Sequence, residues 1–318
     1  MNAAHPSLIR KLAKFLGARK LVDFFRRKPH ESAKELDVQN CSYWTNYNVA
    51  NHRQFSSIAD SLAFLEWRNS QYHNYIELMP VQGQDGKTVL DYGCGPGNDL
   101  VGFAAYSKPG HLVGMDISAK ALDEAKCRVG LHNYVAEFIP ISEQHNQIPL
   151  DAGSVDYIHS SGVVHHAVNP AKVLSEFRRV LKSSGRCRIM VYHYDCLWLH
   201  LCVAYIKMIR ESAFPGLGVR EAFGKMTDTT ACPISRVYKP EEFVELADQC
   251  GFRTRFLGAA IAKAEVALLP ERLEAMECEA LDGEHRRFLA GLTFDAQGLP
   301  LHNGTFAGID GCYELEPV

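Results

Sequence analysis

The turn at residues 89–97, with the sequence VLDYGCGPG, limits the fold of this chain more than any other feature. A short apolar segment ends at Asp91, and glycine then occupies every second position of the turn: Gly93, Gly95 and Gly97. Because glycine has no Cβ, backbone N–H groups in such a turn can approach a ligand closely. Asn98 is a suitable N-cap for a helix that continues through Ala105. The sequence therefore predicts a strand–turn–helix unit with a ligand at its turn.

Strands and helices alternate after this turn, which is typical of an α/β fold with a doubly wound parallel sheet. The predicted strands occupy residues 87–92, 111–116, 134–139, 154–160, 186–192, 252–257 and 309–315. Asp116 ends the second strand, where a carboxylate can accept hydrogen bonds from both ribose hydroxyls of a nucleotide. The alternative for Asp116 is an acid on a solvated loop at a helix N-terminus.

The glycine spacing and a second segment indicate which nucleotide is bound. Dinucleotide-binding folds have G-x-G-x-x-G, whereas this chain has G-x-G-x-G. Residues 156–166 read DYIHSSGVVHH. Together with the glycine turn and Asp116, this segment resembles the class I S-adenosylmethionine-dependent methyltransferases of the small-molecule type, including those of quinone biosynthesis. The resemblance covers about residues 85–260.

The resemblance implies a seven-stranded Rossmann-like methyltransferase sheet of order 3-2-1-4-5-7-6, with strand 7 antiparallel and a helical cap. Residues 309–315 are then strand 7, and residues 258–308 are an insertion before it. Single helices are expected over 58–79 and 267–290. The predicted division of the chain is an N-terminal helical cap or lid (1–80), an S-adenosylmethionine-binding core (81–195), a cap insertion (196–236) and the C-terminal part of the core with its helical insertion (237–318).

The resemblance also implies S-adenosyl-L-methionine as the cofactor and a set of residues that bind it. Asp91, Gly93, Gly95 and Gly97 are expected at its methionine end and Asp116 at its ribose. Ile117 and Ser160 are further cofactor-binding candidates. The family often has an acid after strand three that binds the adenine amino group, but residues 138–144 read FIPISEQ. Ser142 and Glu143 are candidates for that role, and a plain surface loop is an equal alternative for each.

Methyl transfer needs a nucleophile held in line with the sulfonium methyl group, and a hydroxyl nucleophile also needs a base. The candidate bases follow strands four and five: His165, with its neighbour His166, and then His193 and Asp195. An imidazole titrates near neutral pH, which suits the task, and the alternative for His165 is a structural loop histidine that is hydrogen-bonded to the backbone. Two other features have open roles. Tyr43, Trp44 and Tyr47 either close over the site or pack on the sheet, and Arg68 binds the cofactor carboxylate or forms an ion pair.

Composition limits the partners of the chain. The net charge of −3, and SSGV where base-methylating enzymes have Asn-Pro-Pro-Tyr, argue against a nucleic-acid substrate. Ten cysteines without a C-x-x-C pair indicate reduced thiols and a cytoplasmic protein, and no metal site is predicted from their spacing. Residues 6–28 form a predicted basic amphipathic helix. That helix either contacts a membrane surface peripherally or packs on the domain or on a second subunit of a homodimer.

The sequence thus predicts an enzyme that transfers a methyl group from S-adenosylmethionine to a small organic acceptor, with oxygen favoured as the methylated atom. A sugar or a lipid-linked acceptor suits the predicted basic helix, and a quinone or a phenol suits the predicted aromatic cap. The alternatives are an NAD(P)-dependent oxidoreductase, which shares the fold and the strand-two acid, and a catalytically silent cofactor-binding subunit.

Overall fold

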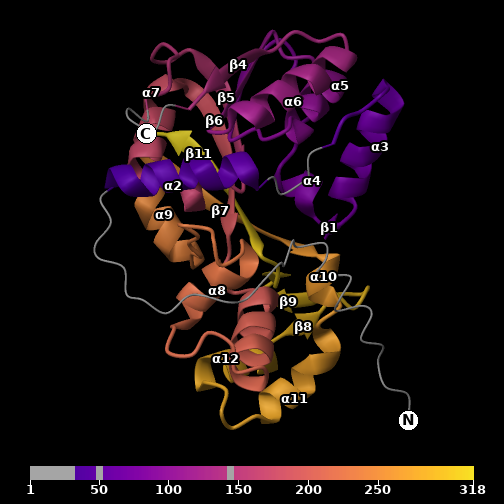
Figure 1. The fold of residues 1–318 in the computed structure, drawn as a ribbon, viewed down its shortest axis with the longest axis vertical. Helices are drawn as coiled ribbons and strands as arrows, with labels where there is room; N and C mark the ends of the chain where they lie inside the picture. Colours follow the sequence, from indigo (N-terminus) through magenta and orange to yellow (C-terminus); the bar gives the residue numbers. More distant parts are fainter. Residues whose placement is uncertain (1–32, 48–52, 142–146) are drawn as a thin grey trace.

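A mixed sheet runs through the upper half of the molecule in Figure 1. The structure is a computed structural model that describes residues 33–47, 53–141 and 147–318. In these ranges the sheet has eight strands, in the order β1-β7-β11-β6-β5-β2-β3-β4. The strands are β1 (Tyr72–His73), β2 (Thr88–Tyr92), β3 (His111–Asp116), β4 (Glu137–Pro140), β5 (Val155–Ser161), β6 (Leu181–Tyr192), β7 (Phe252–Ala262) and β11 (Asp310–Pro317).

The strand order confirms the predicted doubly wound methyltransferase sheet. Strands β4, β3, β2, β5 and β6 are parallel, and β11 pairs antiparallel with both β6 and β7. The predicted last strand is β11, inserted between β6 and β7. The two-residue strand β1 was not predicted, and it adds an eighth strand by pairing Tyr72 with Ala262.

Pairing of β1 explains why the prediction of one helix over 58–79 was wrong. The segment forms α3 (Ile58–Asn69), then β1, then the short helix α4 (Tyr75–Leu78). Asn74 takes a left-handed φ of 67°, which separates β1 from α4. The chain leaves the helix because backbone groups of Tyr72 and His73 complete the edge of the sheet beside β7.

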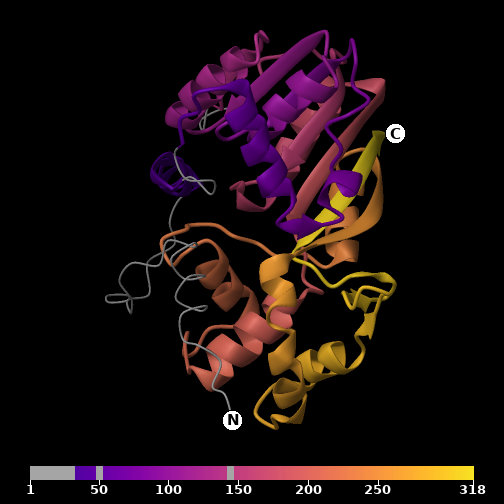
Figure 2. The same cartoon turned by 90° about the vertical axis from the view of Figure 1, so that its right-hand side faces the viewer.

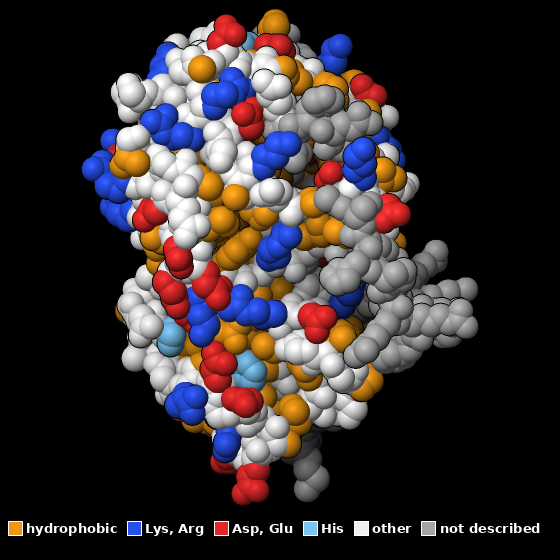
Figure 3. Space-filling view, turned by 90° about the vertical axis from the view of Figure 1, so that its left-hand side faces the viewer, with side chains coloured by type: hydrophobic (Ala, Val, Ile, Leu, Met, Phe, Trp, Pro, Cys, Tyr) orange, Lys and Arg blue, Asp and Glu red, His pale blue; other side chains and the backbone are white. Residues whose placement is uncertain are grey.

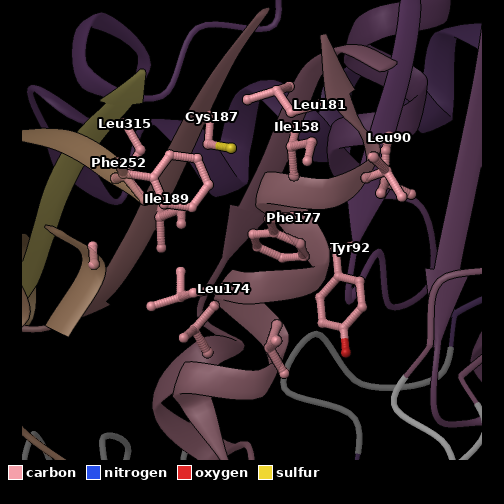
Figure 4. Packing of buried hydrophobic residues seen from close by; sticks show 14 of the residues in the cluster. Leu90, Tyr92, Ile158, Leu174, Phe177, Leu181, Cys187, Ile189, Phe252 and Leu315 are labelled. Carbon is pink, nitrogen blue, oxygen red and sulfur yellow. The ribbon is translucent and has the colours of Figure 1, made fainter. Parts of the chain in front are cut away.

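Helices cover both faces of the sheet and enclose two apolar clusters. On one face, α7 (Pro170–Val180) and α9 (Pro240–Asp248) pack on the strands, and Phe177 lies among Leu90, Ile158 and Ile189 (Figure 4). On the other face, α5 (Asn98–Tyr106) and α6 (Ala119–Leu131) enclose a cluster around Phe103. Burial of these side chains fixes the sheet, so that the carboxyl ends of β2, β3 and β5 meet at one edge.

Local sequence explains most helix starts, with one correction. Ser118 caps α6 by accepting a hydrogen bond from Ala121 N, and Asn169 caps α7 by accepting one from Lys172 N. Helix α5, however, is capped by Gly97 with a φ of 83°, not by Asn98 as expected. The Asn98 side chain instead accepts a hydrogen bond from Arg128 of α6.

A second lobe occupies the lower half of Figure 1 and is built from two insertions. The first contributes the π-helix η2 (Trp198–Arg210) and α8 (Val219–Thr227). The second lies between β7 and β11 and contributes the elements α10 (Lys263–Val266), η3 (Leu269–Glu271), α11 (Arg272–Glu277), α12 (Gly283–Ala290), β8 (Thr293–Phe294), β9 (Pro300–His302) and β10 (Thr305–Phe306). The prediction of one helix over 267–290 was therefore wrong, and the second insertion begins at residue 263 rather than 258 because β7 continues to Ala262.

Helix α2 (Ala33–Asn46) runs horizontally in Figure 1 above α9, and in Figure 2 it is seen end-on at the left-hand side of the molecule. Its Asn40 side chain donates a hydrogen bond to the His166 carbonyl, and the Tyr43 hydroxyl donates one to the Asp228 carbonyl. The predicted helix at 6–28 lies outside the described residues. Within the described ranges, the helices are too short or too polar to cross a bilayer.

Candidate active site

A cavity of about 960 Å³ opens at the carboxyl ends of β2, β3 and β5. The glycine turn, α2 and α3 border one part of it, and residues of β1, β6 and β11 border the other. Figure 3 shows hydrophobic side chains gathered across the middle of one face of the molecule. The cavity therefore lies where open α/β sheets bind their ligands.

Asp116 and the glycine turn form one end of this cavity. Gly93, Gly95, Asp116 and Ile117 all border it. The Asp116 carboxylate accepts hydrogen bonds from Gly95 N and from Ser118 N, both at 2.8 Å. Burial raises the pKa of Asp116, although these backbone bonds act against the shift. Each carboxylate oxygen has a second lone pair, so Asp116 can also accept hydrogen bonds from a ligand.

Three other predicted cofactor residues lie behind the lining. Asp91 is buried, and its Oδ2 has no hydrogen-bond partner among the described residues. Burial raises the pKa of Asp91 to about 7. Gly97 packs against Ala125, and the Ser160 hydroxyl donates a hydrogen bond to the Tyr92 carbonyl. The next residue of β5, Ser161, borders the cavity instead.

A buried charged group supports the turn from the side of α3. Arg68 forms a salt bridge with Asp99, and His159 Nε2 lies 3.4 Å from Asp99 Oδ2. Burial alone would raise the pKa of Asp99, but Arg68 and His159 hold it well below its usual range. Arg68 and Asp99 both border the cavity, so the ion-pair role predicted for Arg68 is present, and its guanidinium also faces the ligand space.

The adenine end of the cavity is described up to Ile141. Ser142 and Glu143 lie outside the described residues. Their neighbour Ile141 borders the cavity and donates its N–H to the Asp116 carbonyl at 2.9 Å. The chain therefore returns to the cavity immediately before the two candidates.

The structure does not bring the three candidate bases to the cavity lining. His165 is fully buried, and both ring nitrogens lack a hydrogen-bond partner within the described ranges. His193 stacks on Phe256 with ring centroids 5.3 Å apart, and burial lowers its pKa to about 3. Asp195 follows it toward the lower lobe. His166, in the short helix η1 (Val164–His166), borders the cavity instead, with its ring centroid 4.0 Å from that of the buried His165 ring.

Side chains that sequence reasoning missed surround the other end of the cavity. They are Tyr72, Tyr75, Met190, Tyr192 and Asp310. Asp310 is buried at the first position of β11, and burial raises its pKa to about 7. Since β11 is antiparallel to its neighbours, its first residue lies at the carboxyl edge of the parallel strands. The predicted start of that strand at residue 309 was the only signal for Asp310 in the sequence.

The aromatic residues of α2 border the same end. Trp44 packs on His166 with ring centroids 4.6 Å apart, and Tyr47 stacks on Tyr43 at 4.6 Å. Trp44 and Tyr47 border the cavity, whereas the Tyr43 hydroxyl is hydrogen-bonded to the Asp228 carbonyl of the lower lobe. Helix α2 thus packs on the sheet region and covers the cavity at the same time.

Comparisons with known proteins agree with this geometry. Residues 84–216 match a family model described as a methyltransferase domain. A 37.1 kDa protein of transposon TN4556 from Streptomyces fradiae is 32% identical over 136 residues, which are 41% of this chain and 39% of that protein. A probable methyltransferase, ltbC, from Aspergillus luteorubrus is 35% identical over 105 residues, which are 30% of this chain and 37% of that protein. The matches to these curated relatives thus span about two fifths of their length.

Among solved structures, the geranyl diphosphate C-methyltransferase of Streptomyces coelicolor has the same fold. It aligns with a TM-score of 0.51 and 14% identity over 89% of this chain and 98% of its own. Its crystals contain S-adenosyl-L-homocysteine. The sheet order, the glycine turn at the end of β2 and the matched family model lead to one assignment: the chain contains a class I S-adenosylmethionine-dependent methyltransferase domain.

Proposed function

We propose that the chain transfers the methyl group of S-adenosylmethionine to an oxygen atom of a small aromatic acceptor. One observation carries the proposal. A single cavity has the glycine turn and Asp116 at one end and a buried acid among tyrosines, Asp310 with Tyr72 and Tyr192, at the other. The volume of about 960 Å³ exceeds that of most drug-sized sites, so there is room for a cofactor and an acceptor together.

The residues at the glycine turn fit the cofactor. An added Cβ at Gly95 would have no atom within 4 Å, so the backbone there is open to a ligand. Asp116 would accept hydrogen bonds from the ribose hydroxyls. Ile117 and Ile141 would flank the adenosine, and the Arg68 guanidinium would face the methionine carboxylate. Asp91, Gly97 and Ser160 would support this cradle from behind, and Ser142 and Glu143 stay candidates for the adenine amino group. When bound, the cofactor supplies an electrophilic methyl group.

Asp310 would orient the acceptor and remove its proton. A carboxyl with a pKa of about 7 is ionised in a large fraction of molecules at neutral pH, and it remains basic enough to accept the proton of a phenol as the methyl group is transferred. Tyr72 and Tyr192 would pack on the acceptor ring and exclude water. Tyr75, whose hydroxyl lies 2.7 Å from Ser161 Oγ, would hold β5 against this wall.

Formation of S-adenosylhomocysteine tests the proposal. The purified chain would be incubated with S-adenosylmethionine and matched aromatic phenols, amines and thiols. We expect turnover with a phenol, and a loss of about 10²–10⁴-fold in kcat for Asp310→Asn with little change in cofactor affinity. Asp123→Asn, on the exposed face of α6, is the matched control and should behave as wild type.

Two results would contradict the proposal in different ways. Turnover with amines or thiols alone would contradict O-methylation. Tight binding of S-adenosylhomocysteine without any methyl transfer would favour the silent cofactor-binding subunit. The kinship with quinone-biosynthesis enzymes, the homodimer, the membrane contact through residues 6–28 and the predicted domain division stay predictions.

A further inference from the structure

A cluster of three potential metal ligands lies beside the acceptor end of the cavity. His166, Asp228 and Cys232 are all buried, and their ligand atoms lie within 4.8 Å of one another. His166 Nε2 is 4.0 Å from Asp228 Oδ2. His166 lies in η1, Asp228 directly follows α8, and Cys232 lies on the loop after it. Sequence spacing could not reveal this cluster, because the fold alone brings His166 to the other two residues.

The hydrogen bond on the other ring nitrogen fixes how His166 is oriented. Its Nδ1 lies 2.7 Å from the Ile234 carbonyl oxygen. A carbonyl only accepts, so Nδ1 carries the hydrogen, and in the neutral ring Nε2 carries a lone pair. That lone pair is on the side of the Asp228 carboxylate, which also only accepts. A cation between these two acceptors would be bound by both, and an imidazole held by a carbonyl in this way is typical of metal sites.

The other two side chains are also positioned for a shared ligand. Asp228 Oδ1 accepts a hydrogen bond from the Tyr192 hydroxyl at 2.8 Å, and Oδ2 accepts one from the Ser235 hydroxyl at 2.6 Å. These bonds orient the carboxylate and leave lone pairs on both oxygens. Cys232 donates its S–H to the Ile234 carbonyl at 3.2 Å, so its sulfur lies next to the imidazole that the same carbonyl holds.

We propose that His166, Asp228 and Cys232 bind a Zn²⁺ ion. A nitrogen, a carboxylate oxygen and a sulfur suit Zn²⁺, whereas Mg²⁺ and Ca²⁺ prefer oxygen ligands only. Metal–ligand distances of about 2.0–2.3 Å require the three donors to approach one another more closely, by side-chain rotation. Binding releases the Cys232 thiol proton to solvent, and the thiolate and the carboxylate then balance the two charges of the ion. Three protein ligands leave a fourth position for water.

The ion would fasten the lower lobe to the sheet at the wall of the cavity. His166 and Tyr192 both border the cavity, and Tyr192 is bonded to Asp228. A bound Zn²⁺ would therefore hold η1, the end of β6 and the loop at 228–235 in one arrangement. The inference does not depend on the proposed methyl transfer, because metal binding is measured without an acceptor.

Metal titration of the purified 318-residue chain tests the site. After dialysis against a chelator, we expect one Zn²⁺ per chain, bound tightly enough to compete with a chromophoric chelator and not displaced by excess Mg²⁺. Cys232→Ser should weaken zinc binding by at least about 100-fold, because loss of a direct ligand costs more than loss of an outer-shell partner. Cys127→Ser, at an exposed cysteine outside the cluster, is the matched control and should bind zinc as wild type does.

Cobalt provides a readout that needs no variant. Co²⁺ in the wild-type chain should give the ultraviolet charge-transfer absorption of a thiolate–cobalt bond and the visible bands of a tetrahedral site. Zinc far below one ion per chain would overturn the proposal, as would a cobalt complex without the thiolate band. Equal zinc affinity in the wild type and in a folded Cys232→Ser chain would also overturn it, because the ion would then be held elsewhere.

Discussion

Gly93, Gly95 and Gly97 all have positive φ, but an added methyl group would meet different surroundings at each. At Gly93 it would lie 2.2 Å from Val163 Cγ2, and at Gly97 it would lie 3.1 Å from the Ala125 backbone. At Gly95 it would meet no atom within 4 Å. Gly93 and Gly97 therefore let the turn pack closely against Val163 and Ala125, whereas Gly95 leaves room for a ligand.

We expect Gly95→Ala to weaken the binding of S-adenosylhomocysteine by at least about tenfold. The new methyl group enters the ligand space, and a left-handed alanine costs about 1 kcal/mol. Calorimetric titration measures the affinity, and thermal unfolding checks that the chain still folds. Gly130→Ala in α6 is the control, since its Cβ also meets no atom within 4 Å and its φ is not left-handed. Equal affinity in the Gly95 variant and the wild type would show that the ligand does not use this turn.

Asp116→Ala should weaken cofactor binding by about 1–3 kcal/mol, which corresponds to roughly 5–150-fold in Kd. The variant removes an acceptor for the ribose hydroxyls and also leaves Gly95 N and Ser118 N without their partner. Asp116→Asn keeps one acceptor oxygen and should lose less. Calorimetry with S-adenosylhomocysteine measures both variants, and unchanged affinity in Asp116→Ala would refute the ribose assignment.

For single residues, the sequence predicts the place of a site residue when that place depends on the local geometry of the chain. Gly93, Gly95, Asp116 and Ile117 border the cavity because they directly follow strands whose order is a property of the fold. Asp310 was not predicted as a site residue, although the expected antiparallel strand at 309–315 begins at the same edge of the sheet, because no local motif marks its carboxyl. Tyr72 was not predicted either, since it reaches the cavity only because β1 pairs with β7.

Among the elements, three segments meet at the buried carboxyl of Glu265. Its Oε2 accepts hydrogen bonds from Ala262 N at 2.9 Å and Ile309 N at 3.1 Å, and its Oε1 accepts one from Trp198 N at 3.3 Å. These donors belong to the end of β7, the residue before β11 and the start of η2. Burial raises the pKa of Glu265 to about 8, yet the three bonds fix how the lower lobe leaves the sheet.

We expect Glu265→Ala to lower the free energy of unfolding by roughly 3 kcal/mol, because three partly buried N–H groups lose their acceptor at about 1 kcal/mol each. Urea denaturation followed by circular dichroism measures the loss. Glu277→Ala, at an exposed position of α11, removes a carboxylate from the same lobe and should change stability little. A Glu265 variant as stable as this control would mean that the junction does not depend on the carboxyl.

Helix and strand boundaries were predicted well only where local signals agree with tertiary packing. Capping residues and an apolar face place α6 and α7 correctly. The helices expected over 58–79 and 267–290 both have helical periodicity, but long-range pairing interrupts the first, and the second divides into three short segments around the apolar cluster of the lower lobe. Hydrophobic periodicity in the sequence cannot reveal either interruption, because both depend on partners that are distant in the chain.

Over the whole molecule, the sheet was predictable and the lower lobe was not. Right-handed crossovers and alternating elements leave few arrangements for the strands, and the observed order is one of them. The lower lobe is built from two insertions that are separated by α9 and β7 in the chain, and their apolar residues, such as Leu201 and Phe288, meet in one cluster only in the folded chain. Its position matters for function, because the cavity wall at Tyr192 and the cluster at Asp228 lie where it joins the sheet.

Buried ionisable groups give the molecule as a whole a defined pH dependence of stability. Asp91 and Asp310 have folded-state pKa values of about 7 and Glu265 one of about 8, each raised by burial from an ordinary carboxyl value. Above pH 6.5 the unfolded chain has lost these protons, whereas the folded chain still binds part of them. Stability therefore falls as pH rises through this range. Buried His193 and His200 have lowered pKa values and act in the opposite sense, but only below pH 6.5.

We therefore expect the free energy of unfolding, without added cofactor, to be greatest near pH 6.5 and to fall by about 1 kcal/mol per raised carboxyl up to pH 8. Urea denaturation at a series of pH values measures the slope. Asp310→Asn removes one of these groups and should make the curve less steep between pH 6.5 and 8, whereas Asp123→Asn should leave it unchanged. A flat wild-type curve over this range would mean that these carboxyls are already ionised in the folded chain, and Asp310 would then lack the elevated pKa that its role as a base requires.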